Sequence, residues 1–554
     1  MKKQNFIQAI VLFIALTTIV FVVVYQTLPP NALPANAPAT EFSAERAIEH
    51  LKVIATEPRL VGGQGYEEAR DYILGELTTL GLTPEIQKTT VDSQKVENVI
   101  VRIEGTESQD AILLVAHLDS VGNSPGAMDD GSGVAALLET ARALRAGSPL
   151  RNSVMLLFTG PEETGAHGAL TFIRGHPWVE DIKLVVNFDA GGMTGPVELT
   201  STSPNNGWLI RELAKADPYA YGTSASGEGR TDFSLAFDPS GFSGYDFNNS
   251  WDRRTHSTFD NIENLNPATI QHHGYHALSL ARHFGNLDSL DDPKDPNPIY
   301  FNVLRLGFVY YPATWVIPIS LIVVLVFSGV VVLGFRRKIL TLSGIALGAL
   351  VFVISLITAP LLVSGLWNWL SSAVPTYQAT YFRHAPNEML LLALFASTTI
   401  ALTTTWYALI QKIRRASTPN LTSGAYGLFA VATAGFAIAM PEASFLSAWS
   451  GLFGFLAVGY WFYSMSDDQE SFSMEQVVAL VLAAFVAIAV MLPVTIASFM
   501  ASEANDWFLP IGMIVLLLGV LVPQLQIITK LNKWWLPVSV WATAAILFLT
   551  AFLA

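Results

Sequence analysis

Residues 111–133 have the sequence AILLVAHLDSVGNSPGAMDDGSG, and this stretch indicates the fold. The apolar run 111–116 predicts a buried strand, which ends at His117-Leu118-Asp119. The glycines that follow permit a tight turn, and residues 133–146 (GVAALLETARALRA) have the apolar spacing of a helix. A buried strand, a polar turn and a helix in succession predict one unit of an α/β fold.

The same succession recurs along the chain. Apolar runs at 154–158 (VMLLF) and 184–188 (LVVNF) predict two further buried strands. Helical spacing occurs at 65–80, 166–174 and 267–284. We therefore predict an α/β three-layer sandwich with a mostly parallel central sheet. Active sites of such folds gather beyond the carboxyl ends of the strands, so the polar residues after each run are the candidates.

The distribution of charge divides the chain into a charged, acidic part and a weakly charged, apolar part. The 554 residues are 51% hydrophobic and 14% charged, against roughly 25% charged in soluble domains. Residues 41–300 hold 37 acidic and 19 basic side chains, whereas 301–554 hold 8 and 10. An acidic domain excludes a nucleic-acid binder, and the long apolar runs exclude a disordered chain. The absence of cysteine excludes disulfides, thiolate catalysis and cysteine-ligated metals.

The apolar segments predict nine membrane spans. Residues 6–25 are long enough to cross a bilayer and predict an uncleaved signal anchor within residues 1–26. Pro-rich segments at 27–42 and 286–311 are predicted linkers around a water-soluble domain, 43–285. A transmembrane domain of about eight helices is expected over 312–554, with spans near 314–335, 340–366, 389–410, 421–440, 445–463, 477–500, 508–528 and 534–554.

Positive charge in the short loops orients these spans. With the N-terminus in the cytoplasm, the inner loops hold Arg336, Arg337, Lys338, Lys412, Arg414, Arg415, Lys530 and Lys533. The outer loops then hold only Arg383, with Arg305 just before the second span. This asymmetry predicts a multi-pass protein of a bacterial cell membrane whose soluble domain is extracytoplasmic.

Candidate metal ligands follow each predicted strand. They are His117 with Asp119, then Asp129 before the first helix, the pair Glu162-Glu163, Asp189, and His256. Each alone has an ordinary explanation, such as a satisfied polar pair or a helix N-cap. Adjacent buried carboxylates, however, repel each other unless a cation compensates them. Five such ligands at successive strand ends of one α/β domain predict a metal site.

The ordered motifs HLDS, PGAMDDGSGVAALLE, GPEETG, NFDAGG and THSTFDNIEN resemble the di-zinc aminopeptidase family. That family includes secreted bacterial leucyl aminopeptidases and glutamate carboxypeptidase II, and the resemblance covers residues 43–285. A tethered domain followed by many spans also resembles the vacuolar membrane protease and endoplasmic reticulum metallopeptidase branch. The resemblance implies the zinc exopeptidase fold and two Zn²⁺ per chain.

The resemblance also implies a role for each residue. One zinc would be held by His117, Asp129 and Asp189, and the other by Asp129, Glu163 and His256. Glu162 would be the general base, and Asp119 would orient His117. A cis peptide bond is expected between Asp129 and Asp130. Three carboxylates and two imidazoles are a ligand set that suits Zn²⁺.

We therefore expect a membrane-bound zinc exopeptidase, an aminopeptidase that releases N-terminal residues of peptides by metal-assisted hydrolysis. A carboxypeptidase, a glutaminyl cyclase-like enzyme and a non-catalytic binding or scaffold module are the alternatives, as is a peptidase domain accessory to a transporter. The expected partners are a peptide substrate and the lipid bilayer, without nucleic acid. The sequence leaves the oligomeric state open, a homodimer included.

Other polar residues of the domain are expected to be structural. His272 and His276 imitate a zinc helix by their i,i+4 spacing, but no acidic residue accompanies them within the helix. His167 is expected at the rim of the site, and Arg230 in a salt bridge rather than on a substrate carboxylate.

Overall fold

The computed structural model describes residues 3–91, 93–227, 229–378, 385–414, 416–465, 472–503, 506–529 and 534–553. The chain forms two units, which are described separately. One consists of residues 28–311, and the other of residues 1–27 and 312–554.

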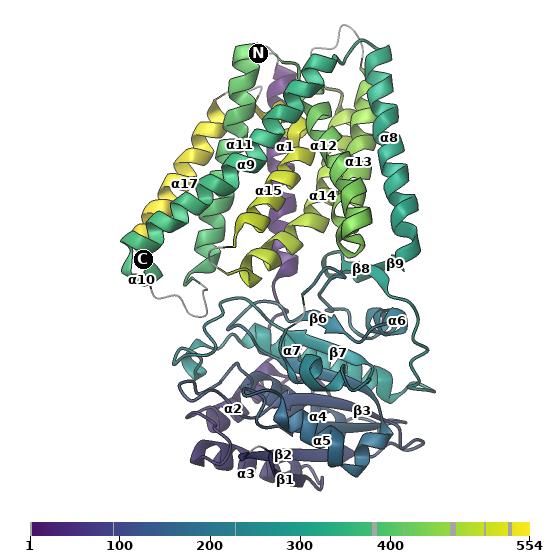
Figure 1. Ribbon diagram of the computed structural model, residues 1–554, viewed down its shortest axis with the longest axis vertical. Helices are drawn as coiled ribbons and strands as arrows, with labels where there is room; N and C mark the ends of the chain where they lie inside the picture. Colours follow the sequence, from purple (N-terminus) through teal and green to yellow (C-terminus); the bar gives the residue numbers. More distant parts are fainter. Residues whose placement is uncertain are drawn as a thin grey trace. The chain divides into compact units, whose positions relative to one another are not determined.

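Unit 28–311 is built on a seven-stranded mixed sheet (Figure 1). In sheet order the strands are β1 (Glu85–Val91), β2 (Gln94–Ile103), β4 (Ser153–Thr159), β3 (Ala111–His117), β5 (Ile182–Asp189), β7 (Gly244–Asn248) and β6 (Glu198–Thr202). Strands β4, β3, β5 and β7 are parallel, while β2 and β6 join them antiparallel, as β1 joins β2. The three predicted strands are the buried centre of this sheet.

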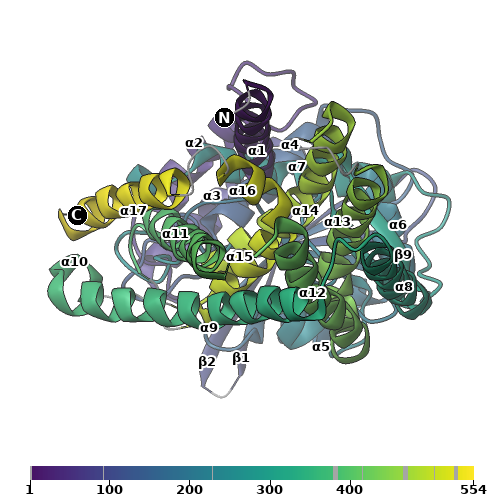
Figure 2. The same cartoon turned by 90° about the horizontal axis from the view of Figure 1, so that it is seen from above.

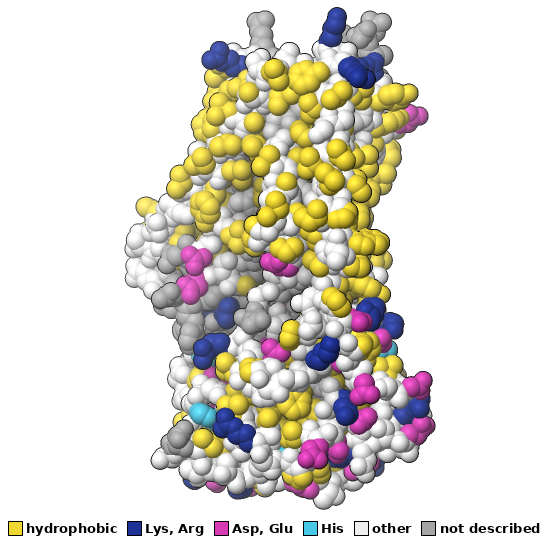
Figure 3. Space-filling view, turned by 45° about the vertical axis from the view of Figure 1, so that its right-hand side comes forward, with side chains coloured by type: hydrophobic (Ala, Val, Ile, Leu, Met, Phe, Trp, Pro, Cys, Tyr) yellow, Lys and Arg dark blue, Asp and Glu magenta, His cyan; other side chains and the backbone are white. Residues whose placement is uncertain are grey.

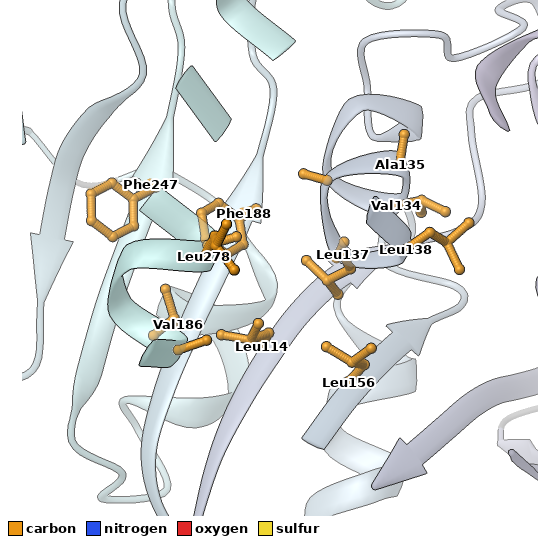
Figure 4. Packing of buried hydrophobic residues seen from close by; sticks show 14 of the residues in the cluster. Leu114, Val134, Ala135, Leu137, Leu138, Leu156, Val186, Phe188, Phe247 and Leu278 are labelled. Carbon is orange, nitrogen blue, oxygen red and sulfur yellow. The ribbon is translucent and has the colours of Figure 1, made fainter. Parts of the chain in front are cut away.

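Helices cover both faces, which confirms the predicted three-layer α/β class. The larger apolar core lies on one face, beneath α2 (Ala44–Ile54), α3 (Gln64–Thr79), α4 (Gly131–Arg145), α6 (Gly207–Ala216) and α7 (Pro267–Gly285). Leu114, Val186 and Phe247 of the sheet contribute to this core with Leu137 of α4 and Leu278 of α7 (Figure 4). A second core on the other face lies beneath α5 (His167–Gly175) and one π-helical turn, η2 (Phe233–Phe237).

The two predicted linkers contain ordered structure. In the first, Phe42 is fully buried, and the Leu33 N–H donates to Gln271 Oε1 of α7 at 2.8 Å. In the second, β8 (Pro298–Asn302) and β9 (Phe308–Pro312) form a two-stranded sheet. Both segments were predicted as linkers from their proline content, which did not indicate this packing.

The other unit is helical. Its helices are α1 (Lys3–Thr27), α8 (Val316–Arg336), α9 (Leu342–Ala373), α10 (Pro375–Gln378), α11 (Glu388–Arg414), α12 (Thr418–Ala439), α13 (Ser444–Ser464), α14 (Met474–Ala501), α15 (Phe508–Val520), α16 (Val522–Thr529) and α17 (Trp535–Leu553). Figure 2 shows them from above. On the face drawn in Figure 3, the surface of this unit is mostly hydrophobic.

Within the described residues, eight helices are long and apolar enough to cross a membrane. The predicted span 508–528 is broken: α15 and α16 meet at a 69° bend, and they make a ninth span only if counted together. Pro523 lies at the start of α16, where its fixed φ is compatible with a new helix. Of the residues used to orient the spans, Arg383, Arg415, Lys530 and Lys533 lie outside the described residues.

Small residues let two of these helices approach closely. A side chain on Gly424 of α12 would collide with the α9 backbone at Ile345, Gly348 and Ala349. Helices α9 and α12 are therefore in backbone contact, as is common where small residues pack in membranes.

Candidate metal centre

The candidate ligands lie at the edge of the sheet where the parallel strands end. His117 ends β3 and Asp189 ends β5, so parallel pairing brings the two side chains to the same level of adjacent strands. Glu162 and Glu163 follow β4, whose last residue pairs with His117. Asp129 precedes α4, and His256 lies in the loop between β7 and α7.

These five ligands form two groups that share Asp129. His117, Asp129 and Asp189 form one group, and Asp129, Glu163 and His256 form the other; within each group the candidate ligand atoms all lie within 4.8 Å of one another. The two oxygens of Asp129 point to different imidazoles. Oδ1 lies 3.1 Å from His117 Nε2, and Oδ2 lies 2.9 Å from His256 Nε2. His256 Nε2 also lies 3.3 Å from Glu163 Oε2.

The backbone around Asp129 is held by two further carboxylates. Asp130 caps α4 by accepting the Gly133 N–H at 3.0 Å, and it also accepts the His117 N–H at 3.1 Å. Asp260 accepts the N–H groups of Met128 and Asp129 at 2.6 and 3.1 Å. The Asp129–Asp130 peptide bond is cis, as the sequence resemblance implied.

Asp119 contacts both His117 and the turn that carries the two glutamates. Its backbone carbonyl lies 3.1 Å from His117 Nδ1, and its carboxylate Oδ1 lies within ion-pair distance of the same nitrogen, at 3.6 Å. The carboxylate also accepts the N–H groups of Glu162 at 2.9 Å and Glu163 at 3.2 Å. Asp119 therefore fixes the turn that carries both glutamates.

Arg59 is a supporting residue that sequence reasoning missed. Its fully buried guanidinium donates to the carbonyls of Leu118 at 2.6 Å and Gly126 at 2.8 Å, and also to the Pro125 carbonyl. These carbonyls belong to the segment between β3 and Asp129. An arginine whose acceptors are all backbone oxygens has no partner that a sequence motif could reveal.

Burial and mutual repulsion govern the protonation of the acids. Burial raises the pKa of Glu163 to about 8 and that of Asp189 to about 7, and the nearby charge of Asp129 adds to both shifts. Burial likewise raises the pKa of Glu162 well above its usual range.

The two imidazoles respond in the opposite sense. Burial disfavours their charge, but the carboxylates of Asp119 and Asp129 raise the pKa of His117 well above its usual range. Asp129, followed by Glu163, raises the pKa of His256 to about 9 against the same effect of burial. The cluster thus holds protons that a cation would displace on binding.

The residues present fit a metal ion. Glu163 Oε1 is buried and has no hydrogen-bond partner in the structure, as expected for an oxygen that faces a cation. Three carboxylates and two imidazoles are borderline-hard donors, which suit Zn²⁺. Glu162 belongs to neither group, and its buried carboxyl lies beside them.

The other predicted polar residues belong to neither ligand group. His272 contacts the Tyr219 carbonyl and the Val197 N–H, and His276 contacts Asp217, so both are occupied by structural partners. His167 begins α5 and is half-buried, while Arg230 is exposed.

Comparison with known proteins finds relatives among membrane proteases. The chain is 27% identical over 311 residues to endoplasmic reticulum metallopeptidase 1 of Mus musculus, covering 49% of this chain and 34% of that protein. It is 26% identical over 348 residues to the vacuolar membrane protease of Candida dubliniensis, covering 58% and 37%. The chain thus spans about a third of the length of these relatives.

Among solved structures, a zinc aminopeptidase from Bacillus subtilis is similar, with 14% identity and a TM-score of 0.38. The match covers 44% of this chain and 95% of that one. A family model also matches residues 98–281, which include all five candidate ligands. The matching model is that of Peptidase family M28.

Proposed function

We propose that this chain is a zinc-dependent, membrane-bound peptidase, and that it acts as an aminopeptidase. The observation that carries the proposal is the pair of carboxylate–imidazole groups that share Asp129, with the buried Glu162 beside them. The sequence match to the M28 family and the apolar helices support the same assignment.

Two zinc ions would occupy the two groups. His117, Asp129 and Asp189 would hold one ion, and Asp129, Glu163 and His256 the other, so that Asp129 bridges them. Zinc supplies a Lewis acid that polarises a peptide carbonyl and lowers the pKa of water.

Glu162 would transfer the protons. Its carboxylate takes a proton from the attacking water and passes it to the nitrogen of the leaving amine, as a general base and then a general acid. Asp119 positions this carboxylate, because it accepts the N–H groups of both Glu162 and Glu163. Asp260 holds the backbone at Asp129, and Asp130 accepts the N–H groups of His117 and Gly133.

The membrane topology belongs to the same proposal. The N-terminus would lie in the cytoplasm and the peptidase domain outside it, in a bacterial cell membrane, as the loop charges predict. A reporter enzyme fused after residue 40 tests this orientation, because it would be active only on the extracytoplasmic side.

The test of activity is digestion of a mixture of peptides by the zinc-loaded full chain in detergent, followed by mass spectrometry. Stepwise loss of N-terminal residues is expected from wild type. Glu162→Gln should retain zinc but lose about 10²–10⁴-fold in activity, the usual contribution of general base catalysis. Glu180→Gln, a matched substitution of an exposed glutamate in the same domain, should retain full activity.

The result also separates the alternatives. Loss of C-terminal residues would identify a carboxypeptidase, and no cleavage by a protein that binds two zinc ions would identify a non-catalytic module. Full turnover by Glu162→Gln would exclude Glu162 as the base.

A further inference from the structure

A row of side chains crosses the sheet at the level of the candidate ligands. Strand pairing places Thr159 of β4 beside His117, Asp189 beside Asn248 of β7, and Asn248 beside Glu198 of β6. Residues paired in this way share one face of the sheet. Glu198 therefore lies on the face and edge of the metal ligands, two strands beyond Asp189; β6 and β7 are labelled in Figure 1.

Contacts of the neighbouring residues confirm which face this is. Leu199 and Phe247 belong to the larger core on the opposite face. Ser201 of β6 pairs with Asp246 of β7 on the same face as Glu198. Ser201 Oγ lies 3.5 Å from Asp246 Oδ2. The side chain of Glu198 thus points away from α7 and toward the side of η2.

Glu198 is a buried acid with an unpartnered oxygen. The residue is 9% exposed, and its Oε1 is buried with no hydrogen bond. Among the described residues, no lysine, arginine or histidine lies within ion-pair distance of it. Burial raises its pKa to about 8. The pKa of Tyr221 is raised well above its usual range by burial, and the charge of Glu198 raises it further.

Two other buried acids of this unit, outside the ligand groups, have polar or charged partners. Asp246 accepts hydrogen bonds from Asn187 at 2.9 Å and Thr231 at 2.8 Å. Glu139 is paired with Arg46 at 2.7 Å and Arg142 at 2.6 Å. A buried carboxyl that keeps neither kind of partner is costly to stability, so its presence at this edge calls for a ligand.

We propose that Glu198 is a specificity residue that binds the cationic side chain of a substrate lysine or arginine next to the scissile bond. Adjacent strands are about 4.8 Å apart, so Glu198 stands about 10 Å along the sheet from Asp189. This separation suits a long basic side chain that extends from a peptide whose scissile bond lies at the ligands. The inference rests on the proposed peptidase function.

The test compares aminoacyl amides of lysine, arginine and leucine as substrates of the zinc-loaded full chain. Wild type should prefer the basic substrates. Glu198→Gln, which keeps size and removes charge, should lower the lysine-to-leucine ratio of kcat/KM by about 30-fold or more, the usual loss when one partner of a buried charge pair is removed. Glu180→Gln should leave the ratio unchanged. A wild type without basic preference, or a ratio within about threefold of wild type in Glu198→Gln, would overturn the proposal.

Equilibrium binding separates this inference from the peptidase assignment. Lysinamide and leucinamide are titrated into Glu162→Gln and into the double variant Glu162→Gln/Glu198→Gln, both unable to turn them over. Tighter binding of lysinamide that the second substitution abolishes supports a cation site even if no peptide is hydrolysed. Equal binding of both amides to the two proteins overturns the cation site even if peptides are hydrolysed.

Discussion

Asp119→Asn is the substitution that best tests how the site is supported. The Asp119 carboxylate accepts two backbone N–H groups, from Glu162 at 2.9 Å and Glu163 at 3.2 Å. An asparagine has one acceptor oxygen in that position, and its NH₂ group would face the second N–H. One buried donor is therefore left without an acceptor, which costs about 1–3 kcal/mol.

This cost falls on the turn that carries the candidate ligand Glu163. If about 2 kcal/mol is lost from the metal-bound arrangement, zinc binds about 30-fold more weakly, since 1.4 kcal/mol is a factor of ten. The same range, 10- to 100-fold, is typical when a residue that supports a metal ligand is replaced.

The assay is competition for zinc between a fluorescent chelator and the full chain in detergent. Asp110→Asn is the matched control, because Asp110 directly precedes β3, the strand that Asp119 follows, and is only half-buried, 3.8 Å from Lys183. It should bind zinc as wild type does. An Asp119→Asn protein that binds zinc within about threefold of wild type, or about 0.6 kcal/mol, would refute the supporting role of the carboxylate.

Three further predictions concern stability. Burial lowers the pKa of His273 to about 3, below its value near 6.5 in an unfolded chain. The unfolded state therefore binds more protons between these values, and this contribution to stability is lost as pH falls below 6.5, by about 1.4 kcal/mol per pH unit. The melting temperature of His273→Gln, relative to that of wild type, should rise as the pH is lowered from 7.5 to 5. A difference in melting temperature that does not change with pH would contradict this. Gly274→Ala places a methyl group into the Phe42 ring and should cost about 1–3 kcal/mol, with partial recovery in Gly274→Ala/Phe42→Leu. An unchanged melting temperature of Gly274→Ala would show that Phe42, in the segment before α2, does not pack on α7. Gly424→Ile should separate α9 from α12 and lower the melting temperature of the helical unit, whereas Gly435→Ile, where no atom lies within 4 Å of an added Cβ, should not.

The strands and helices that the sequence indicates are those with strong apolar periodicity. Strands β3, β4 and β5 are continuous apolar runs because helices cover both of their faces. Strand β6 (ELTST) at the side of the sheet carries polar residues, and its sequence has no such run. The bend between α15 and α16 was also missed, because the apolar run continues through it.

In the candidate site too, the sequence reveals some residues and not others. The ligands His117, Asp129, Glu163, Asp189 and His256 are recognisable because metal chemistry requires their side-chain types, and the structure brings them together. Their binding of zinc stays a prediction. Asp260 and Arg59 escaped notice because they act on backbone N–H and carbonyl groups, which every residue possesses.

The loop from Thr255 to Asp260 connects the two ligand groups, which determines how metal ions would leave the protein. It supplies the ligand His256, and four residues later Asp260 anchors the backbone of the shared ligand Asp129. Opening this loop would remove a ligand from one group and release the bridge that belongs to both. We therefore expect demetallation to be concerted: a chelator titration should show a single transition that removes both ions, with loop 255–260 becoming accessible to proteases at the same chelator concentration.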